Sequence, residues 1–269
     1  GMTLAGGCPN KNLLRLGGGS LRSLIVLVIL AITAYMTLKG LFAEFRVAYL
    51  DPVALDLSGL GLQQASLGAL LSSLSGLPFA TALTAATTVC AVALLVFVFR
   101  DREFRADPAQ VVSGIVLGLL VAAAWFVTGH VGFGESPETL EDVYFATNSR
   151  TLESLSFVAP MAYSLEMLLL WTDKSLRMTF GIASVLGVAL GAFVEARLSG
   201  RFRWEGFASL QDLRQNLAGA VLMGFGGITA LGCTIGQGLS GLSSLAIGSM
   251  IAVAGIVTGS AATMKWLAR

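Results

Sequence analysis

The chain has 269 residues, of which 55% are hydrophobic and only 12% are charged, and its formal net charge is +1. A soluble protein carries about 25% charged residues, so we expect lipid to be the solvent for most of this chain. The near-neutral charge argues against nucleic-acid binding, and three cysteines without C-x-x-C spacing beside a single histidine argue against a disulfide framework or a metal site.

The first segment along the chain is Gly1–Gly19, a glycine-rich stretch around Cys8 that we expect to be mostly loop. A helix needs about twenty apolar residues to cross a bilayer. Apolar runs predict spanning helices at Leu21–Leu38, Phe79–Phe99, Val111–Thr128, Leu155–Trp171, Thr179–Val194 and Leu245–Ala262. We therefore expect an all-α, multi-pass membrane protein.

The segments between these runs differ in polarity and charge. The stretch 40–77 predicts a loop with a short interfacial helix, because it contains Asp51-Pro52, Asp56 and the Ser-Gly-Leu-Gly run 58–61. The stretch 131–154 predicts a solvated acidic loop; its carboxylates are Glu135, Glu138, Glu141, Asp142 and Glu153. Arginines and aromatic residues at 197–207 predict an interfacial anchor, and the positive-inside rule places the basic loops 100–105 and 173–177 in the cytoplasm.

The apolar stretch Asn216–Leu231 is rich in glycine and stops just before Cys233. We expect it to enter the membrane from the outside and to break there without crossing. Non-helical backbone at membrane depth is tolerated only where protein buries it or water reaches it. The break therefore predicts a cavity or a constriction.

The two cysteines at opposite ends of the chain lie in near-identical settings. At one offset of 225 residues the sequence matches at Gly1/Gly226, Ala5/Ala230, Gly7/Gly232 and Cys8/Cys233. A repeated glycine-rich break beside a thiol is typical of a duplicated membrane protein with a central site. We predict a single transport domain, 1–269, in which a first cysteine motif (1–40) and a second (216–266) form inverted repeats that meet near the membrane midplane. An apolar run precedes the second motif but not the first, so we expect the sequence to be N-terminally incomplete.

The chemistry of these motifs suits a soft anion. Glycines let the backbone approach a ligand closely, and the N-terminus of a broken helix presents unpaired N–H groups. A thiol adds a polarisable group that forms weak hydrogen bonds to sulfur or is oxidised. The combination predicts a pathway for a sulfur-containing or selenium-containing anion. Its candidate residues are Cys8, Cys233, Gly6, Gly7, Gly232, Thr234, Gln237 and Gly238.

Plainer interpretations stay open beside this one. At glycine-packed helix crossings the two cysteines would only fill space. Glu166 is either a functional intramembrane carboxylate or an interfacial one, and Asn10 and Arg15 are further candidates. Cys90 lies in a continuous apolar run without a glycine break, so we expect it to be a packing residue.

The segments Ala5-Gly6-Gly7-Cys8-Pro9 and Arg15–Gly19, with 224–227 and 232–241, resemble the YeeE/YedE family of sulphur-transport membrane proteins. The resemblance implies an hourglass-shaped bacterial inner-membrane protein built as an inverted repeat, with thiosulfate uptake as the best-understood activity. It implies that cysteines at two constrictions pass the ion along by transient S–H···S hydrogen bonds, a role that falls here on Cys8 and Cys233. A further functional cysteine of the family precedes the first motif and has no counterpart in this sequence.

The same resemblance leaves the substrate open. Gln237 stands where thiosulfate-type members often have histidine, and some relatives are linked to selenium metabolism. The family also implies a small cytoplasmic sulfur-carrier protein as a partner. The alternative is a membrane sulfurtransferase or thiol redox enzyme, but no histidine or C-x-x-C pair adjoins either thiol to activate it. We predict a permease rather than an enzyme, without a cofactor.

Overall fold

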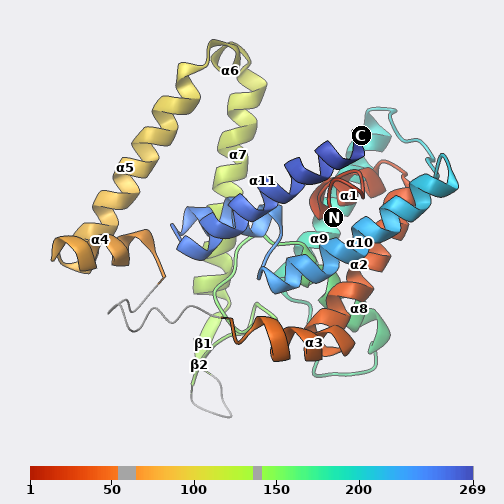
Figure 1. Cartoon of the computed structure of the whole chain (residues 1–269), viewed down its shortest axis with the longest axis horizontal. Helices are drawn as coiled ribbons and strands as arrows, with labels where there is room; N and C mark the ends of the chain where they lie inside the picture. The colour runs from red at the N-terminus through yellow and green to blue at the C-terminus, as the bar shows by residue number, and fades with distance from the viewer. Residues whose placement is uncertain (54–64, 136–140, 269) are drawn as a thin grey trace.

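The computed structural model describes residues 1–53, 65–135 and 141–268, and most of this part of the chain is helical (Figure 1). The α-helices are α1 (Pro9–Gly17), α2 (Leu21–Lys39), α3 (Leu41–Phe45), α4 (Leu67–Ser75), α5 (Phe79–Arg100), α6 (Arg102–Ala106), α7 (Pro108–Phe126), α8 (Val158–Leu169), α9 (Phe180–Leu198), α10 (Leu210–Thr229) and α11 (Ile247–Leu267). The segments η1 (Arg46–Leu50), η3 (Val127–Val131) and η4 (Gly236–Gly241) are π-helical. The strands β1 (Phe133–Glu135) and β2 (Asp142–Tyr144) pair as a small antiparallel hairpin.

Within these described residues, 5 helices are long and apolar enough to cross a bilayer: α2, α5, α7 continued by η3, α9 and α11. They confirm the predicted helices at the corresponding runs. The prediction of a spanning helix at Leu155–Trp171 is wrong, because α8 has only 12 residues. At 1.5 Å per residue such a helix is about 18 Å long, well short of a hydrocarbon core of about 30 Å.

The connecting segments are more structured than the sequence predicted. Gly1–Gly19 is not mostly loop, since α1 occupies its second half. The stretch 40–77 holds α3, η1 and α4 rather than a single short helix, and the acidic stretch 131–154 contains the β1–β2 hairpin. The predictions at Asp56, 58–61 and Glu138 lie outside the described residues.

Helix α2 lies at the centre of the packed part of the molecule and contacts α1, α8 and α10. Its inward face is fully buried at Val26, Leu30 and Ala34. Helix α10 approaches α2 closely at Gly224, where an added Cβ would lie only 2.8 Å from the Leu30 carbonyl oxygen. Close approach at small residues is the usual way in which helices associate in lipid, because lipid gives no hydrophobic drive between helices.

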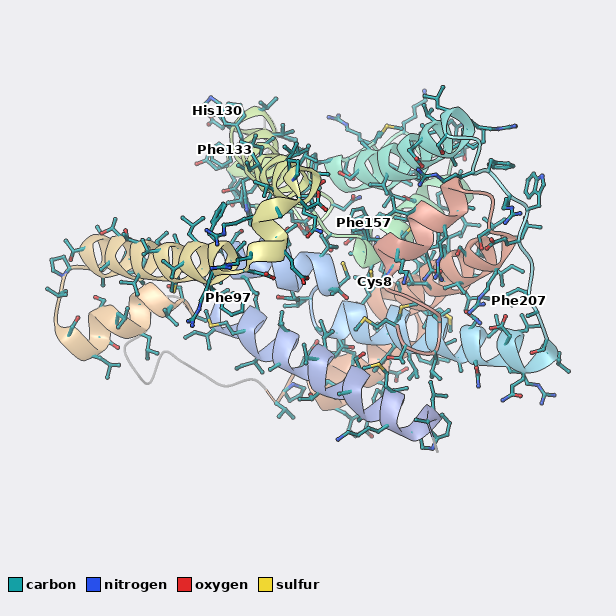
Figure 2. The ribbon with its side chains drawn as sticks, turned by 90° about the horizontal axis from the view of Figure 1, so that it is seen from above. Cys8, Phe97, His130, Phe133, Phe157 and Phe207 are labelled. Carbon is teal, nitrogen blue, oxygen red and sulfur yellow. The ribbon has the colours of Figure 1, made fainter. Side chains whose placement is uncertain are left out.

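Helices α5 and α7 are joined by α6 and diverge from it, and α5 extends away from this packed part (Figure 1). Only 11% of the apolar window of α5 and 17% of that of α7 are buried. Figure 2, the view from above, shows Cys8 among the packed helices and His130 near one edge of the molecule. Helices α5 and α7 therefore expose mostly apolar side chains, as expected of helices that face lipid.

Candidate functional site

The second cysteine motif begins where α10 ends. The last turn of α10 closes through a hydrogen bond from the Gly232 N–H to the Gly227 carbonyl oxygen, at 2.9 Å. Leu231 adopts the left-handed backbone conformation, with φ +54°, in the place where helices commonly end on glycine. The chain then turns at Cys233, which is only 5% exposed, and starts a second helical stretch that includes η4.

The Cys233 thiol lies at the N-terminal end of that second stretch. Its Sγ accepts a hydrogen bond from the Gly236 N–H, at 3.4 Å. The unpaired N–H groups at a helix start make this a place of positive potential. The chain is therefore interrupted between α10 and the next helical stretch, with the sulfur at the start of that stretch.

The first cysteine motif has the same local form. Gly6 is left-handed with φ +69°, and Gly7 follows with φ +157°. Cys8 occupies the position just before α1, whose first residue is Pro9, and it is half-buried. Arg15 contacts this turn, and its Nη1 donates a hydrogen bond to the Gly6 carbonyl oxygen at 2.9 Å.

The agreement between the motifs extends past the cysteines. Leu231 and Gly6 are both left-handed two residues before a cysteine, although one is a leucine and the other a glycine. Left-handed residues also precede the two long helices that follow, Gly19 (φ +101°) before α2 and Leu245 (φ +53°) before α11. The two motifs thus share a left-handed residue two positions before the cysteine and another two positions before the long helix that follows.

Two cavities meet at the Cys233 turn. The first, which we call the thiol cavity, has a volume of about 480 Å³ and is lined by Cys233 and Thr234. The second, the polar cavity, has a volume of about 370 Å³ and is lined by Gln237 and Gly236. Both are lined by Gly227 and Gly232. The turn that carries the buried thiol therefore lies between the two.

The thiol cavity brings the two motifs together. Met2, Thr3 and Pro9 line it from the first motif, beside Cys233 and Thr234 from the second. The Thr234 hydroxyl donates to the Met2 Sδ at 3.7 Å, and the hydroxyls of Thr3 and Ser260 are 3.2 Å apart. Its lining offers hydroxyl donors and sulfur atoms, and among the residues that the structure describes it includes no charged side chain.

The polar cavity has a different lining, with Arg46, Glu153 and Tyr163 among its side chains. Burial raises the pKa of Glu153 above its usual value, and a hydrogen bond with Ser149 opposes the shift. The Gln237 side chain closes part of the wall, since its Nε2 donates to the Ala230 carbonyl oxygen at 2.6 Å.

The remaining sequence candidates do not line these cavities, and neither do Cys8, Gly6, Gly7 and Arg15 of the first motif. Gly238 lies inside η4, and Asn10 is half-buried on α1. Glu166 is 6% exposed and pairs with Lys39 Nζ at 2.6 Å, which ties α8 to the end of α2. Cys90 lies on α5 and lines neither cavity. Among the residues that the structure describes, no three histidine, cysteine or carboxylate side chains gather where they could hold a metal ion.

Sequence reasoning missed three buried polar residues beside the motifs. Asn12 and Ser23 are each 1% exposed, and Ser249 is 7% exposed. The 225-residue offset contained a signal for the first of them, because it pairs Asn12 with Gln237. The serines have no such signal, since their role depends on where α2 and α11 begin.

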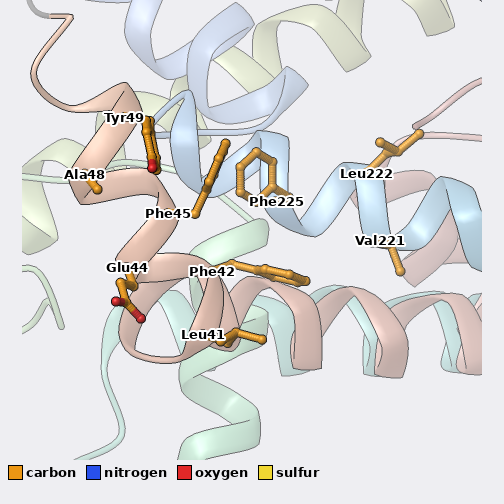
Figure 3. A pocket seen from close by; sticks show the side chains of 9 residues that line it. All are labelled: Leu41, Phe42, Glu44, Phe45, Ala48, Tyr49, Val221, Leu222 and Phe225. Atoms are coloured by element: carbon orange, nitrogen blue, oxygen red, sulfur yellow. The ribbon is translucent and has the colours of Figure 1, made fainter.

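An apolar groove of about 650 Å³ lies between α3–η1 and α10 (Figure 3). Phe225 lies edge-on to Phe42, with ring centroids 6.0 Å apart, and the Phe45 ring is tilted against that of Tyr49, with centroids 5.2 Å apart. Neither thiol lines this groove.

Comparison with known proteins places these features in a wider group. A family model described as "Sulphur transport" matches residues 1–262. The thiosulfate transporter TsuA of Spirochaeta thermophila is 27% identical over 278 residues, which cover 99% of this chain and 74% of that protein. The thiosulfate transporter TsuA of Escherichia coli is 30% identical over 128 residues, which cover 48% of this chain and 30% of that protein.

Proposed function

The chain belongs to the sulphur transport family, and from that premise we propose that it is an inner-membrane permease for a small sulfur-containing anion, with thiosulfate as its substrate. The observation that carries this proposal is the position of Cys233, a buried thiol on a helix break between two cavities that share two lining glycines. The names of both TsuA relatives favour thiosulfate among sulfur anions.

The thiol cavity suits passage rather than tight binding. Hydroxyl groups of Thr3, Thr234 and Ser260 can donate hydrogen bonds to the oxyanion, while none of the described lining residues has a charged side chain that would hold it. Conduction requires binding that is strong enough for entry and weak enough for release. Neutral donors meet both needs better than a fixed cation would.

The thiols then act on the sulfur end of the ion. In this proposal the Cys233 S–H donates a weak hydrogen bond to the terminal sulfur of thiosulfate, and Cys8 repeats the contact at the first motif. The thiol remains protonated and no covalent bond forms, so each contact is easily exchanged. The two motifs would approach the membrane from opposite faces as inverted repeats. A small sulfur-carrier protein would receive the imported anion at the cytoplasmic face.

Uptake of labelled thiosulfate tests this function, in cells that lack other thiosulfate importers and express the full-length protein. Cys233→Ala and Cys8→Ala should each lower uptake about tenfold or more, because each removes a hydrogen bond to a charged substrate. Cys90→Ala is the matched control and should transport normally.

The outcomes separate the competing functions. Normal uptake by both motif variants would make the cysteines packing residues and would end the thiol pathway. A persulfide or disulfide on Cys233, detected by mass spectrometry after exposure to thiosulfate, would instead favour a sulfurtransferase or redox enzyme. Uptake of selenium anions in preference to thiosulfate would reassign the substrate within the family.

A further inference from the structure

Each cysteine turn is tied to the long helix that follows it by one side-chain amide and one serine. In the second motif the Gln237 Nε2 donates to the Ala230 carbonyl oxygen, and its Oε1 accepts a hydrogen bond from the Ser249 hydroxyl at 2.5 Å. The amide thus spans the break between α10 and η4 and connects it to α11.

The first motif contains the same arrangement. The Asn12 Nδ2 donates to the carbonyl oxygens of Gly7 and Cys8, at 3.1 and 3.2 Å. The Asn12 Oδ1 accepts a hydrogen bond from the Ser23 hydroxyl at 3.0 Å. The amide here spans the turn on which Cys8 lies and connects it to α2.

The two arrangements use equivalent positions. Asn12 and Gln237 each lie four residues after a cysteine. Ser23 is the third residue of α2, and Ser249 is the third residue of α11. Asparagine and glutamine differ in length and bond different carbonyl oxygens of their turns. Both nevertheless accept a hydrogen bond from the serine at the third position of the following helix, so the shared feature is the link between turn and helix.

The backbone around Gln237 and Ser249 packs tightly against their side chains. A Cβ on Gly232 would lie 3.1 Å from the Gln237 side chain. A Cβ on Gly241 would clash with the Ser249 hydroxyl. A buried amide without partners would be costly, and a fully satisfied buried network fixes one geometry.

We propose that Asn12–Ser23 and Gln237–Ser249 are matched positioning pairs, each of which fixes the cysteine turn of its own motif relative to the helix that follows. They act on the substrate only through the thiol they position, and in this respect the inference rests on the proposed function. Gln237 is accordingly a positioning residue whose amide is engaged within the protein at both of its ends.

The test compares thiol labelling in a background in which Cys90 and one of the two motif cysteines are replaced by alanine. A maleimide reagent then reports on the remaining thiol. Ser249→Ala should raise the labelling rate of Cys233 about fivefold and leave Cys8 unchanged, because one hydrogen bond that holds the turn is lost. Ser23→Ala should do the reverse.

Two further variants separate positioning from general loss of structure. Ser249→Thr keeps the hydroxyl and should restore the wild-type labelling rate. Ser244→Ala removes an exposed hydroxyl that bonds the nearby Gly241 carbonyl oxygen, at 2.8 Å, and should leave the labelling rate of both thiols unchanged. Equal acceleration at both thiols by either serine variant would mean general loosening and would overturn the proposal, as would no change at all.

Thiosulfate uptake is a second, independent test of the positioning pairs. In the full-length protein with its cysteines intact, Ser249→Ala should lower the maximal rate of thiosulfate uptake with the amount of protein in the membrane unchanged. Selective labelling changes with no thiosulfate uptake even by the wild type would uphold the positioning pairs and overturn the proposed function. Normal uptake together with unchanged labelling would overturn the positioning pairs alone.

Discussion

Backbone strain at Leu231 marks the second cysteine turn. The left-handed conformation costs a leucine about 1–2 kcal/mol, whereas Gly6 adopts it at the equivalent place without that steric cost. Leu231 is 87% exposed, so burial of its side chain does not offset the backbone strain. The surrounding hydrogen bonds, including the one from Gly232 to Gly227, must therefore hold the turn.

The ion pair between the buried Glu166 and the half-exposed Lys39 predicts which of two substitutions destabilises the protein more. Lys39→Met should lower the free energy of unfolding by about 3 kcal/mol, because it leaves the Glu166 carboxylate buried without its cation. Glu166→Gln should cost less, since it leaves the half-exposed lysine free to reach solvent. Thermal unfolding of purified protein in detergent measures both, and a larger loss in Glu166→Gln would contradict this assignment.

Glu153 predicts a dependence of stability on pH. Burial raises its pKa in the folded protein above the unfolded value, so the folded state binds the proton more tightly. The free energy of unfolding should then fall as pH rises from the ordinary glutamate pKa through the raised one, and stay lower above it. Glu153→Gln should flatten this slope in unfolding experiments run across that pH range. An unchanged slope would mean that other groups cause it.

At the scale of elements, the close approach of α2 and α10 positions the second cysteine motif. Gly224 makes that approach possible, whereas Gly226, on the same helix, has open space where a Cβ would lie. Helix α10 ends at Thr229, so its packing against α2 determines where the break and Cys233 lie.

These two glycines provide a matched pair of substitutions. Gly224→Ala should destabilise the protein by about 1–3 kcal/mol, because the new methyl group meets the α2 backbone. Gly226→Ala should be neutral or mildly stabilising, since alanine is the better helix former and meets nothing. Unfolding temperatures of the two variants check the contrast. Equal effects would show that the helices separate to accept a side chain.

At the scale of the whole molecule, the short helix α8 and the helix α10, after which the chain breaks, pack against α2, while α5 extends outward. Short and broken elements are expected where protein, rather than lipid, surrounds them. The two cysteine motifs both reach the thiol cavity, and this places the proposed pathway in the packed part of the molecule.

The sequence by itself determined the membrane character, the positions of the long apolar helices and the repeated cysteine motif, because composition, run length and spacing are local properties. It predicted a break before Cys233 for the same reason, since the glycines that permit it are adjacent in the chain. Only the tertiary structure decided that Leu155–Trp171 does not span, and that Glu166 is neutralised by Lys39. The tertiary structure alone shows that Cys233 lies between two cavities and that Gln237 is hydrogen-bonded to Ser249. Those features depend on which helices lie against one another, and the close approaches that bring them together are not encoded in any single segment.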